Sequence, residues 1–79
     1  MHKIRPDMDI GGNIRKLRKN CELTQDEVVT KLQLMGIETS RSVYSRYEIN
    51  LLNIRVSEIV ALKQILNCRY SDFFEGLET

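Results

Sequence analysis

The sequence has few of the residues on which metal sites and enzyme active sites most often depend. Its 79 residues contain one histidine, two cysteines and no tryptophan, and the single histidine, His2, lies close to the N-terminus. A metal site needs several correctly spaced ligands, and proton transfer near neutral pH is most often carried by histidine. The sequence also has no glycine-rich phosphate loop and no evident pairing of a nucleophile with a base. We therefore expect no enzyme activity, no metal, no cofactor and no small-molecule substrate.

Proline and long hydrophobic runs are also scarce. The one proline, Pro6, prevents a helix from running through residues 1–8, which we expect to form a flexible basic N-terminal arm. No apolar segment approaches the roughly 18 to 20 residues of a membrane span, and the N-terminus lacks the apolar core of a signal peptide. The expected localisation is therefore cytoplasmic, with no membrane partner. In that compartment Cys21 and Cys68 are expected to be reduced packing residues, and a disulfide between them would need an oxidising environment.

Helix-forming residues, by contrast, are abundant. Hydrophobic residues make up 42% of the chain, Leu, Ile, Lys, Glu and Arg dominate, and no run alternates as a strand would. A chain of this length has room for one domain with a small core. Apolar residues repeat at helical spacing in five stretches, near residues 10–21, 24–35, 41–49, 57–66 and 70–77. The sequence therefore predicts a single all-α domain over residues 9–77.

Capping residues mark where the predicted helices begin. Thr24 and Glu27 have the spacing of a capping box, in which each side chain bonds the backbone N–H of the other residue. Ser40 is a strong N-cap for the third helix, and Asp9 can cap the first. These positions divide the chain at the points where the hydrophobic periodicity restarts.

Other residues mark helix ends and weak points. Gly36 and Asn50 tolerate the left-handed conformation that ends a helix, so we expect stops after the second and third helices. Gly11 and Gly12 weaken the first turn of the first helix by up to about 1 kcal/mol each, and its start is expected to fray. Residues 51–56 fit either a loop or the entry to the fourth helix.

Positive charge is concentrated in the first part of the chain. Residues 1–46 carry nine Lys or Arg against six Asp or Glu, whereas residues 47–79 carry three against five. Within the third predicted helix, Arg41 and Arg46 lie outward, while Tyr44 and Tyr47 are expected in the core. Arginines near the start of a short capped helix are typical of helices that read DNA bases, and the alternative is a solvated surface.

Several short elements follow one another in a characteristic order. They are Ile14-Arg15-Lys16-Leu17-Arg18, Leu23-Thr24-Gln25-Asp26-Glu27, Ser45-Arg46-Tyr47-Glu48, Leu66-Asn67-Cys68 and Phe73-Phe74. In this order they resemble the phage-repressor and Cro-like, or Xre-like, helix-turn-helix family, over nearly the whole of residues 9–77. The resemblance implies a compact five-helix, lambda-repressor-like DNA-binding domain that acts as a homodimer.

The resemblance also implies roles for individual residues. Contacts with DNA bases are expected from Arg41, Ser42, Val43 and Arg46. Contacts with DNA phosphates are expected from Thr24, Gln25, Ser45 and Asn50. Arg18 and Glu48 match a family pair that forms a buried ion pair between the first and third helices, so both are expected to be structural.

The expected function is therefore a sequence-specific transcriptional regulator, most simply a repressor, that binds double-stranded DNA at a short inverted repeat through the major groove. The alternative is a protein-interaction module of the same fold, such as an antitoxin or an antagonist of a regulator. Leu51 and Leu52 favour this alternative, because they replace the basic residues that often follow the family's recognition helix. With Phe73 and Phe74 they also suggest a dimer surface.

The connection over residues 33–39 exceeds the tight turn of well-known members, so either the second helix gains a turn or the connection loops out.

Overall fold

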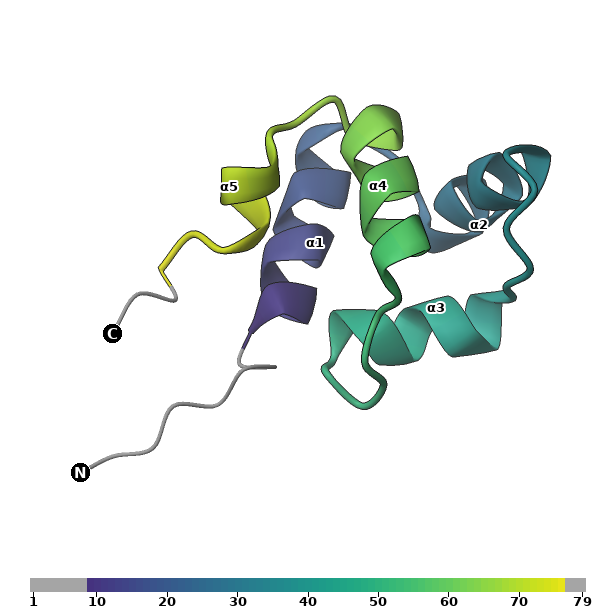
Figure 1. Ribbon diagram of the computed structural model, residues 1–79, viewed down its shortest axis with the longest axis horizontal. Helices are drawn as coiled ribbons and strands as arrows, with labels where there is room; N and C mark the ends of the chain where they lie inside the picture. The colour runs from purple at the N-terminus through teal and green to yellow at the C-terminus, as the bar shows by residue number, and fades with distance from the viewer. Residues whose placement is uncertain (1–8, 77–79) are drawn as a thin grey trace.

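The computed structural model describes residues 9–76, and within that range it contains five helices and no strand (Figure 1). The helices are α1 (Ile10–Asn20), α2 (Gln25–Leu34), α3 (Arg41–Glu48), α4 (Val56–Ile65) and α5 (Tyr70–Phe73). The prediction of an all-α fold is confirmed. The predicted arm over residues 1–8 and the apolar Leu77 lie outside the described residues. Of the described helices, none has both the length and the apolar character needed to cross a membrane.

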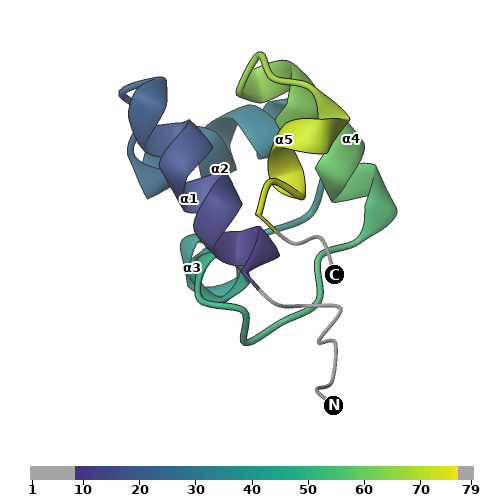
Figure 2. The ribbon, with the colours of Figure 1, turned by 90° about the vertical axis from the view of Figure 1, so that its left-hand side faces the viewer.

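The helices surround one small hydrophobic core. α1 packs against α3 and α5, and α2 packs against α3 and α4, so that α3 runs along one edge of the molecule below α2 and α4 (Figure 1). Figure 2 shows α5 beside α1 on the opposite side from α3. The fully buried apolar residues are Ile14, Val28, Leu32, Tyr44, Leu62 and Phe73. Each such side chain contributes about 1.5–3 kcal/mol of transfer free energy, and together they fix the positions of the helix axes.

The boundaries of α2 follow the predicted capping chemistry. Thr24 Oγ1 accepts from the Glu27 backbone N–H at 3.1 Å, and Glu27 Oε1 accepts from the Thr24 N–H at 2.8 Å. At the other end, Gly36 has a φ of 86°, and the Ile37 N–H reaches back to the Leu32 carbonyl at 3.0 Å. This Schellman arrangement satisfies carbonyls that the helix end would otherwise leave free.

The structure defines the two segments for which the sequence allowed two alternatives, residues 33–39 and 51–56. α2 ends at Leu34 without an additional turn, and residues 35–40 loop out before the Ser40 hydroxyl caps α3 at the Val43 N–H, at 3.2 Å. After α3, residues 49–55 form a loop, with Asn50 in the left-handed region at a φ of 63° as predicted. Of the two adjacent phenylalanines expected on a dimer surface, only Phe74 is exposed, because Phe73 is part of the core.

One expectation for the start of α1 was wrong, and Gly11 has a role there that the sequence did not indicate. Asp9 precedes the helix, but its backbone is left-handed and its side chain makes no capping bond. The first turn is instead held by Asn50, whose Oδ1 accepts from the Gly11 N–H at 3.0 Å. Gly11 is buried against α3, where a Cβ atom would overlap the Tyr47 carbonyl oxygen and lie 2.8 Å from the Glu48 carbonyl carbon. The glycine is therefore a requirement for close packing of α1 on α3.

Candidate nucleic-acid interface

The helix α3 has a fixed face and an exposed face. Its residues Tyr44, Tyr47 and Glu48 are buried, and the two tyrosine rings meet edge to face with centroids 6.4 Å apart. The predicted base-contacting residues Arg41, Ser42 and Arg46 are exposed, whereas the fourth, Val43, is half-buried and packs on the core. Three of the four side chains are therefore accessible to a ligand that lies along α3.

The expected ion pair between α1 and α3 is present and buried. Arg18 Nε donates to Glu48 Oε2 at 2.6 Å, and Arg18 Nη2 donates to Oε1 at 3.0 Å. The same guanidinium also donates from Nη1 to the carbonyl of Leu23, at 2.8 Å, in the segment that leads into α2. Because two parallel bonds fix the plane of both groups, the pair sets the rotation of α3 relative to α1.

Gln25 connects this ion pair to the surface. Its Nε2 donates to Glu48 Oε1 at 2.9 Å, and its Oε1 accepts from Arg41 Nε at 2.8 Å. Arg41 also lies 3.4 Å from the Asp26 carboxylate, but both side chains are more than half exposed, so that pair adds little stability. A continuous line of polar contacts therefore leads from buried Arg18 to exposed Arg41, across α1, α2 and α3.

These contacts also shift the ionisation of Glu48. Burial raises the pKa of its carboxyl group, but the Arg18 guanidinium, with the neighbouring Tyr44 and Gln25 side chains, outweighs burial, so the pKa lies below its usual value of 4.5. The hydrogen bond to Glu48 in turn raises the pKa of Arg18. Burial raises the pKa of Tyr44. The Tyr44 hydroxyl lies near the Arg18–Glu48 ion pair and acts on that pair electrostatically, but it has no hydrogen-bond partner. The site therefore remains an ion pair at neutral pH.

The N-terminus of α2 borders a basic hollow. The hollow has a volume of about 430 Å³, and Thr24 and Gln25 line it together with Arg15 and Lys19 of α1, Arg41 of α3 and one acidic residue, Asp26. Arg15 and Lys19 were not among the predicted site residues. Their spacing of four on one helix face was the available signal, but only the folded chain brings them to the same hollow as Thr24.

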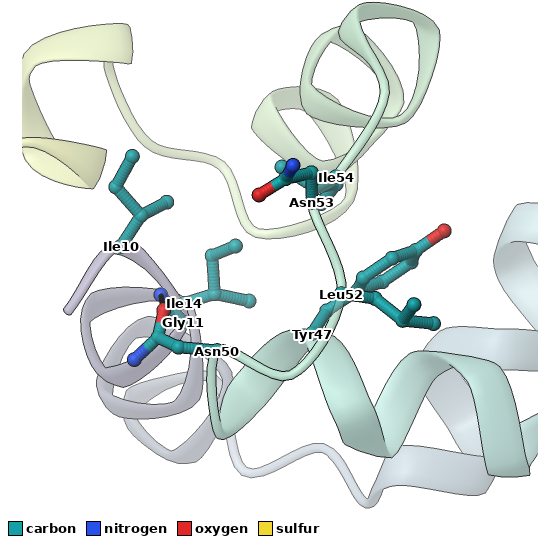
Figure 3. A pocket seen from close by; sticks show the side chains of 8 residues that line it. All are labelled: Ile10, Gly11, Ile14, Tyr47, Asn50, Leu52, Asn53 and Ile54. Carbon is teal, nitrogen blue, oxygen red and sulfur yellow. Dashed lines mark hydrogen bonds between the residues drawn. The ribbon is translucent and has the colours of Figure 1, made fainter. Parts of the chain in front are cut away.

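The other two predicted phosphate contacts already have partners within the fold. The Ser45 hydroxyl donates to the Ser42 carbonyl at 2.9 Å, inside α3. The side-chain Oδ1 of Asn50 accepts a hydrogen bond from the Gly11 N–H (Figure 3). The amide N–H groups of the Asn50 side chain remain free to donate. Both side chains are half-buried, as is that of Gln25, whose amide is likewise engaged by Glu48 and Arg41.

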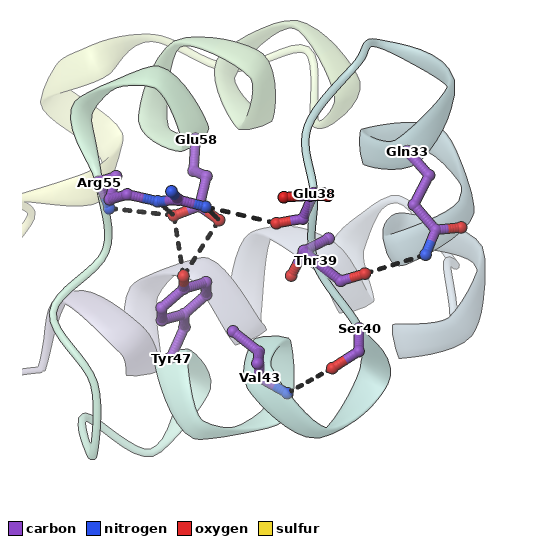
Figure 4. A network of polar contacts seen from close by, with 8 residues as sticks. All are labelled: Gln33, Glu38, Thr39, Ser40, Val43, Tyr47, Arg55 and Glu58. Atoms are coloured by element: carbon purple, nitrogen blue, oxygen red, sulfur yellow. Dashed lines mark hydrogen bonds and ion pairs between the residues drawn. The ribbon is translucent and has the colours of Figure 1, made fainter.

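A second polar network, which the sequence did not indicate, holds α3 from the other side (Figure 4). Glu58 is fully buried, and its carboxylate accepts from the Tyr47 hydroxyl at 2.9 and 3.0 Å and from the Arg55 N–H at 3.1 Å. Arg55 Nη2 also donates to the Glu38 carbonyl at 3.3 Å, in the connection between α2 and α3. The network therefore ties α3 and the connection before it to the start of α4.

The two cysteines pack against the core as expected. Both are half-buried free thiols, and Cys21 Sγ donates to the Leu66 carbonyl at 3.2 Å. Burial raises the pKa of the Cys68 thiol, which disfavours the reactive thiolate. Among residues 9–76, no group of three or more His, Cys, Asp or Glu residues could hold a metal ion.

Comparison with known proteins finds no match to this chain among protein-family models, curated sequences or solved structures.

Proposed function

We propose that this protein is a sequence-specific DNA-binding regulator of transcription, most simply a repressor. In this proposal α2 and α3 form a helix-turn-helix, and α3 is the recognition helix that enters the major groove. Two copies bind an inverted repeat, because a two-fold symmetric reader matches a two-fold symmetric site. The resemblance to the Xre-like family led to this expectation, and the geometry around α3 supports it.

The observation that carries the proposal is the contrast between the two faces of α3. Its inner face is held by the Arg18–Glu48 pair and by the bond from Tyr47 to Glu58, so the helix is positioned from both sides. Its outer face presents two exposed arginines, Arg41 and Arg46. Arginine binds guanine O6 and N7 through two parallel hydrogen bonds, which requires a donor that is positioned in advance.

The basic hollow beside α2 supports the same orientation. The N-terminus of a helix attracts anions through its free backbone N–H groups, and Arg15 and Lys19 add positive charge at the same place. A DNA strand that passes this hollow would place a phosphate near Thr24 and Gln25 while α3 lies in the adjacent groove. Phosphate contacts of this kind set the register in which α3 meets the bases.

The experiment that tests the proposal begins with selection of bound duplexes from random DNA. Fluorescence anisotropy then measures the affinity for the selected duplex and for a scrambled one, across a salt series. We expect preference for the selected duplex, a G·C pair in each half-site, and affinity that falls steeply as salt rises. Equal and weak binding to both duplexes would contradict the proposal.

Single substitutions test whether α3 makes the contact with DNA. We expect Arg46→Ala to weaken binding to the selected duplex by about 1–3 kcal/mol. The matched control is Arg69→Ala, which removes the same charge from a side chain that is 82% exposed at the start of α5. If both variants bind equally well, α3 is not the reading element.

Exposed apolar residues at the end of α2 favour a second candidate, a protein-interaction module such as an antitoxin or a regulator's antagonist. Leu34 is 81% exposed and Met35 is 44% exposed, on a helix whose other face is in the core. Charge reversal of Arg41 and Arg46 to glutamate separates the two candidates. It would abolish binding to DNA, whereas binding to a protein at the end of α2 would persist.

A further inference from the structure

The guanidinium group of Arg41 is held by two neighbouring residues of α2. Its Nε donates to Gln25 Oε1 at 2.8 Å, and its Nη1 lies 3.4 Å from both carboxylate oxygens of Asp26. The side chain of Arg46, on the same face of α3, is exposed, and no hydrogen bond or ion pair joins it to another of residues 9–76. Of the two exposed arginines of α3, Arg41 is therefore the one that the fold orients in advance.

These two contacts leave Arg41 enough donors to bind a base. A guanidinium group carries five N–H donors, and Gln25 and Asp26 engage one each. Guanine O6 and N7 together accept two parallel hydrogen bonds from one arginine. Arg41 can therefore bind guanine without leaving either residue of α2, and both contacts then fix the plane of its guanidinium group.

Asp26 is also the one acidic residue among those that line the basic hollow. Its neighbours there include the positively charged Arg15, Lys19 and Arg41. Its carboxylate opposes the attraction that this hollow exerts on a phosphate, and binding to DNA of any sequence depends mainly on phosphates. Guanine O6 and N7 carry no net charge, so Asp26 repels them much less than it repels a phosphate.

We propose that Asp26 is a specificity-determining residue of this interface, which orients Arg41 toward guanine and weakens the attraction of the hollow for phosphate. The inference rests on the proposed function and deepens it, since it names a residue that favours binding to the correct sequence over binding to any sequence. Asp26 acts through Arg41, so it is a positioning residue and not a base contact.

The exposure of the pair is compatible with this role. In water the contact between Asp26 and Arg41 adds little stability, because the side chains are 71% and 59% exposed. DNA that lies along α3 would displace water from the pair. The effective dielectric constant around the two charges would then fall, and their attraction would strengthen in the complex. The contact therefore matters more for the geometry of the bound state than for the stability of the free protein.

The test measures base discrimination by fluorescence anisotropy. It uses the selected duplex, the scrambled duplex, and duplexes in which single G·C pairs are replaced by A·T. The pair that Arg41 reads is the one whose replacement no longer changes the affinity of Arg41→Ala. At that pair, we expect Asp26→Asn to lower the preference for G·C by about fivefold. It should also raise the affinity for the scrambled duplex. At the pair that Arg46→Ala identifies in the same way, Asp26→Asn should leave the preference unchanged.

The matched control is Glu27→Gln. It removes the same charge from the next residue of α2, which neither contacts Arg41 nor lines the hollow, and glutamine keeps the acceptor for the Thr24 N–H. Glu27→Gln should leave base discrimination unchanged, which separates positioning from general repulsion of DNA. In the background of Arg41→Ala, Asp26→Asn should have no further effect on base preference. Circular dichroism should show unchanged helix content for all these variants.

Three results would overturn the inference alone: Asp26→Asn that leaves the preference for G·C unchanged, Glu27→Gln that lowers it equally, or an effect of Asp26→Asn on base preference that persists without Arg41. In each case the unmodified chain still prefers the selected duplex, so the proposed function stands. An unmodified chain that binds the selected and scrambled duplexes equally would overturn the proposed function, and the inference with it.

Discussion

Gln25 donates a hydrogen bond to Glu48 at 2.9 Å, and this bond joins the first residue of α2 to the last residue of α3. The two residues are 23 positions apart in the sequence. Since the other end of the Gln25 amide accepts from Arg41, one side chain couples a buried carboxylate to an exposed arginine. A ligand that moves Arg41 must therefore either break that bond or move Gln25 against Glu48.

Gln25→Ala should destabilise the protein by about 1 kcal/mol, because Glu48 loses one of its hydrogen-bond donors but keeps Arg18. The change should also release Arg41 from α2. Urea unfolding followed by circular dichroism measures the loss of stability. Gln64→Ala is the control, since Gln64 is exposed on α4 and its replacement should change stability by less than about 0.5 kcal/mol. Equal stability of the two variants would mean that the bond to Glu48 contributes nothing measurable.

The ion pair predicts how stability depends on pH. The folded-state pKa of Glu48 lies below its usual value of 4.5, because Arg18, with the neighbouring Tyr44 and Gln25, outweighs burial. A carboxyl group with a lowered pKa contributes stability that is fully present above its unfolded pKa and is lost as the pH falls through the folded pKa. The protein should therefore lose stability below about pH 4.5 as Glu48 becomes protonated.

A double substitution isolates this contribution to the pH dependence. Arg18→Met with Glu48→Leu removes both charges, so stability at neutral pH should stay near that of the unmodified chain or exceed it. Arg18→Met alone leaves Glu48 charged and unpaired, at a cost of about 3–5 kcal/mol. In acid titrations monitored by circular dichroism, the double variant should lose less stability than the unmodified chain between pH 5 and pH 3. Parallel titration curves would show that Glu48 is not responsible.

Two adjacent glycines should respond in opposite ways to the same substitution. Gly11→Ala adds a Cβ atom against the backbone of Tyr47 and Glu48, and these atoms cannot move without displacing α3. It should destabilise the protein by about 1–3 kcal/mol. Gly12→Ala would meet only the side chain of Asp9, which can rotate away, so it should be neutral or gain up to about 1 kcal/mol of helix propensity. Thermal unfolding of the two variants measures both effects, and a Gly11→Ala variant as stable as Gly12→Ala would rule out the close approach of α1 and α3.

These cases show which parts of the molecule could be predicted from its sequence. The helix boundaries at Thr24, Ser40 and Gly36 could be predicted, because capping depends on a few neighbouring residues and on the conformational preferences of each one. The burial of Tyr44 and Tyr47 followed from helical spacing in the same way. In each of these cases the deciding contacts lie within about one helical turn.

The contacts that were missed depend on residues far apart in the sequence. Gly11 was taken for a weak point because local propensity disfavours glycine in a helix, whereas the packing of α1 on α3 makes it necessary. Glu58 gave no signal, since a glutamate in the first turn of a helix is ordinarily exposed and only the position of Tyr47 explains its burial. The partner of Asn50, the Gly11 N–H, was hidden for the same reason, whereas the Ser42 carbonyl that binds Ser45 lies only three residues away in α3. Resemblance suggested the Arg18–Glu48 pair, which composition and spacing alone could not have indicated.

The two core tyrosines allow a test of the Glu58 network by one chemical change. Tyr47→Phe removes the hydroxyl that donates to Glu58 and leaves a fully buried carboxylate with fewer donors, so the protein should lose about 1–3 kcal/mol of stability. Tyr44→Phe removes a buried hydroxyl that has no partner, and it should be neutral or slightly stabilising. Both changes keep the aromatic ring in the same core, so the difference between them isolates the hydrogen bond from the packing. Urea unfolding of the two variants measures that difference directly. If Tyr44→Phe proved the more damaging substitution, the polar contact that holds α3 would lie at the Arg18–Glu48 pair and not at Glu58.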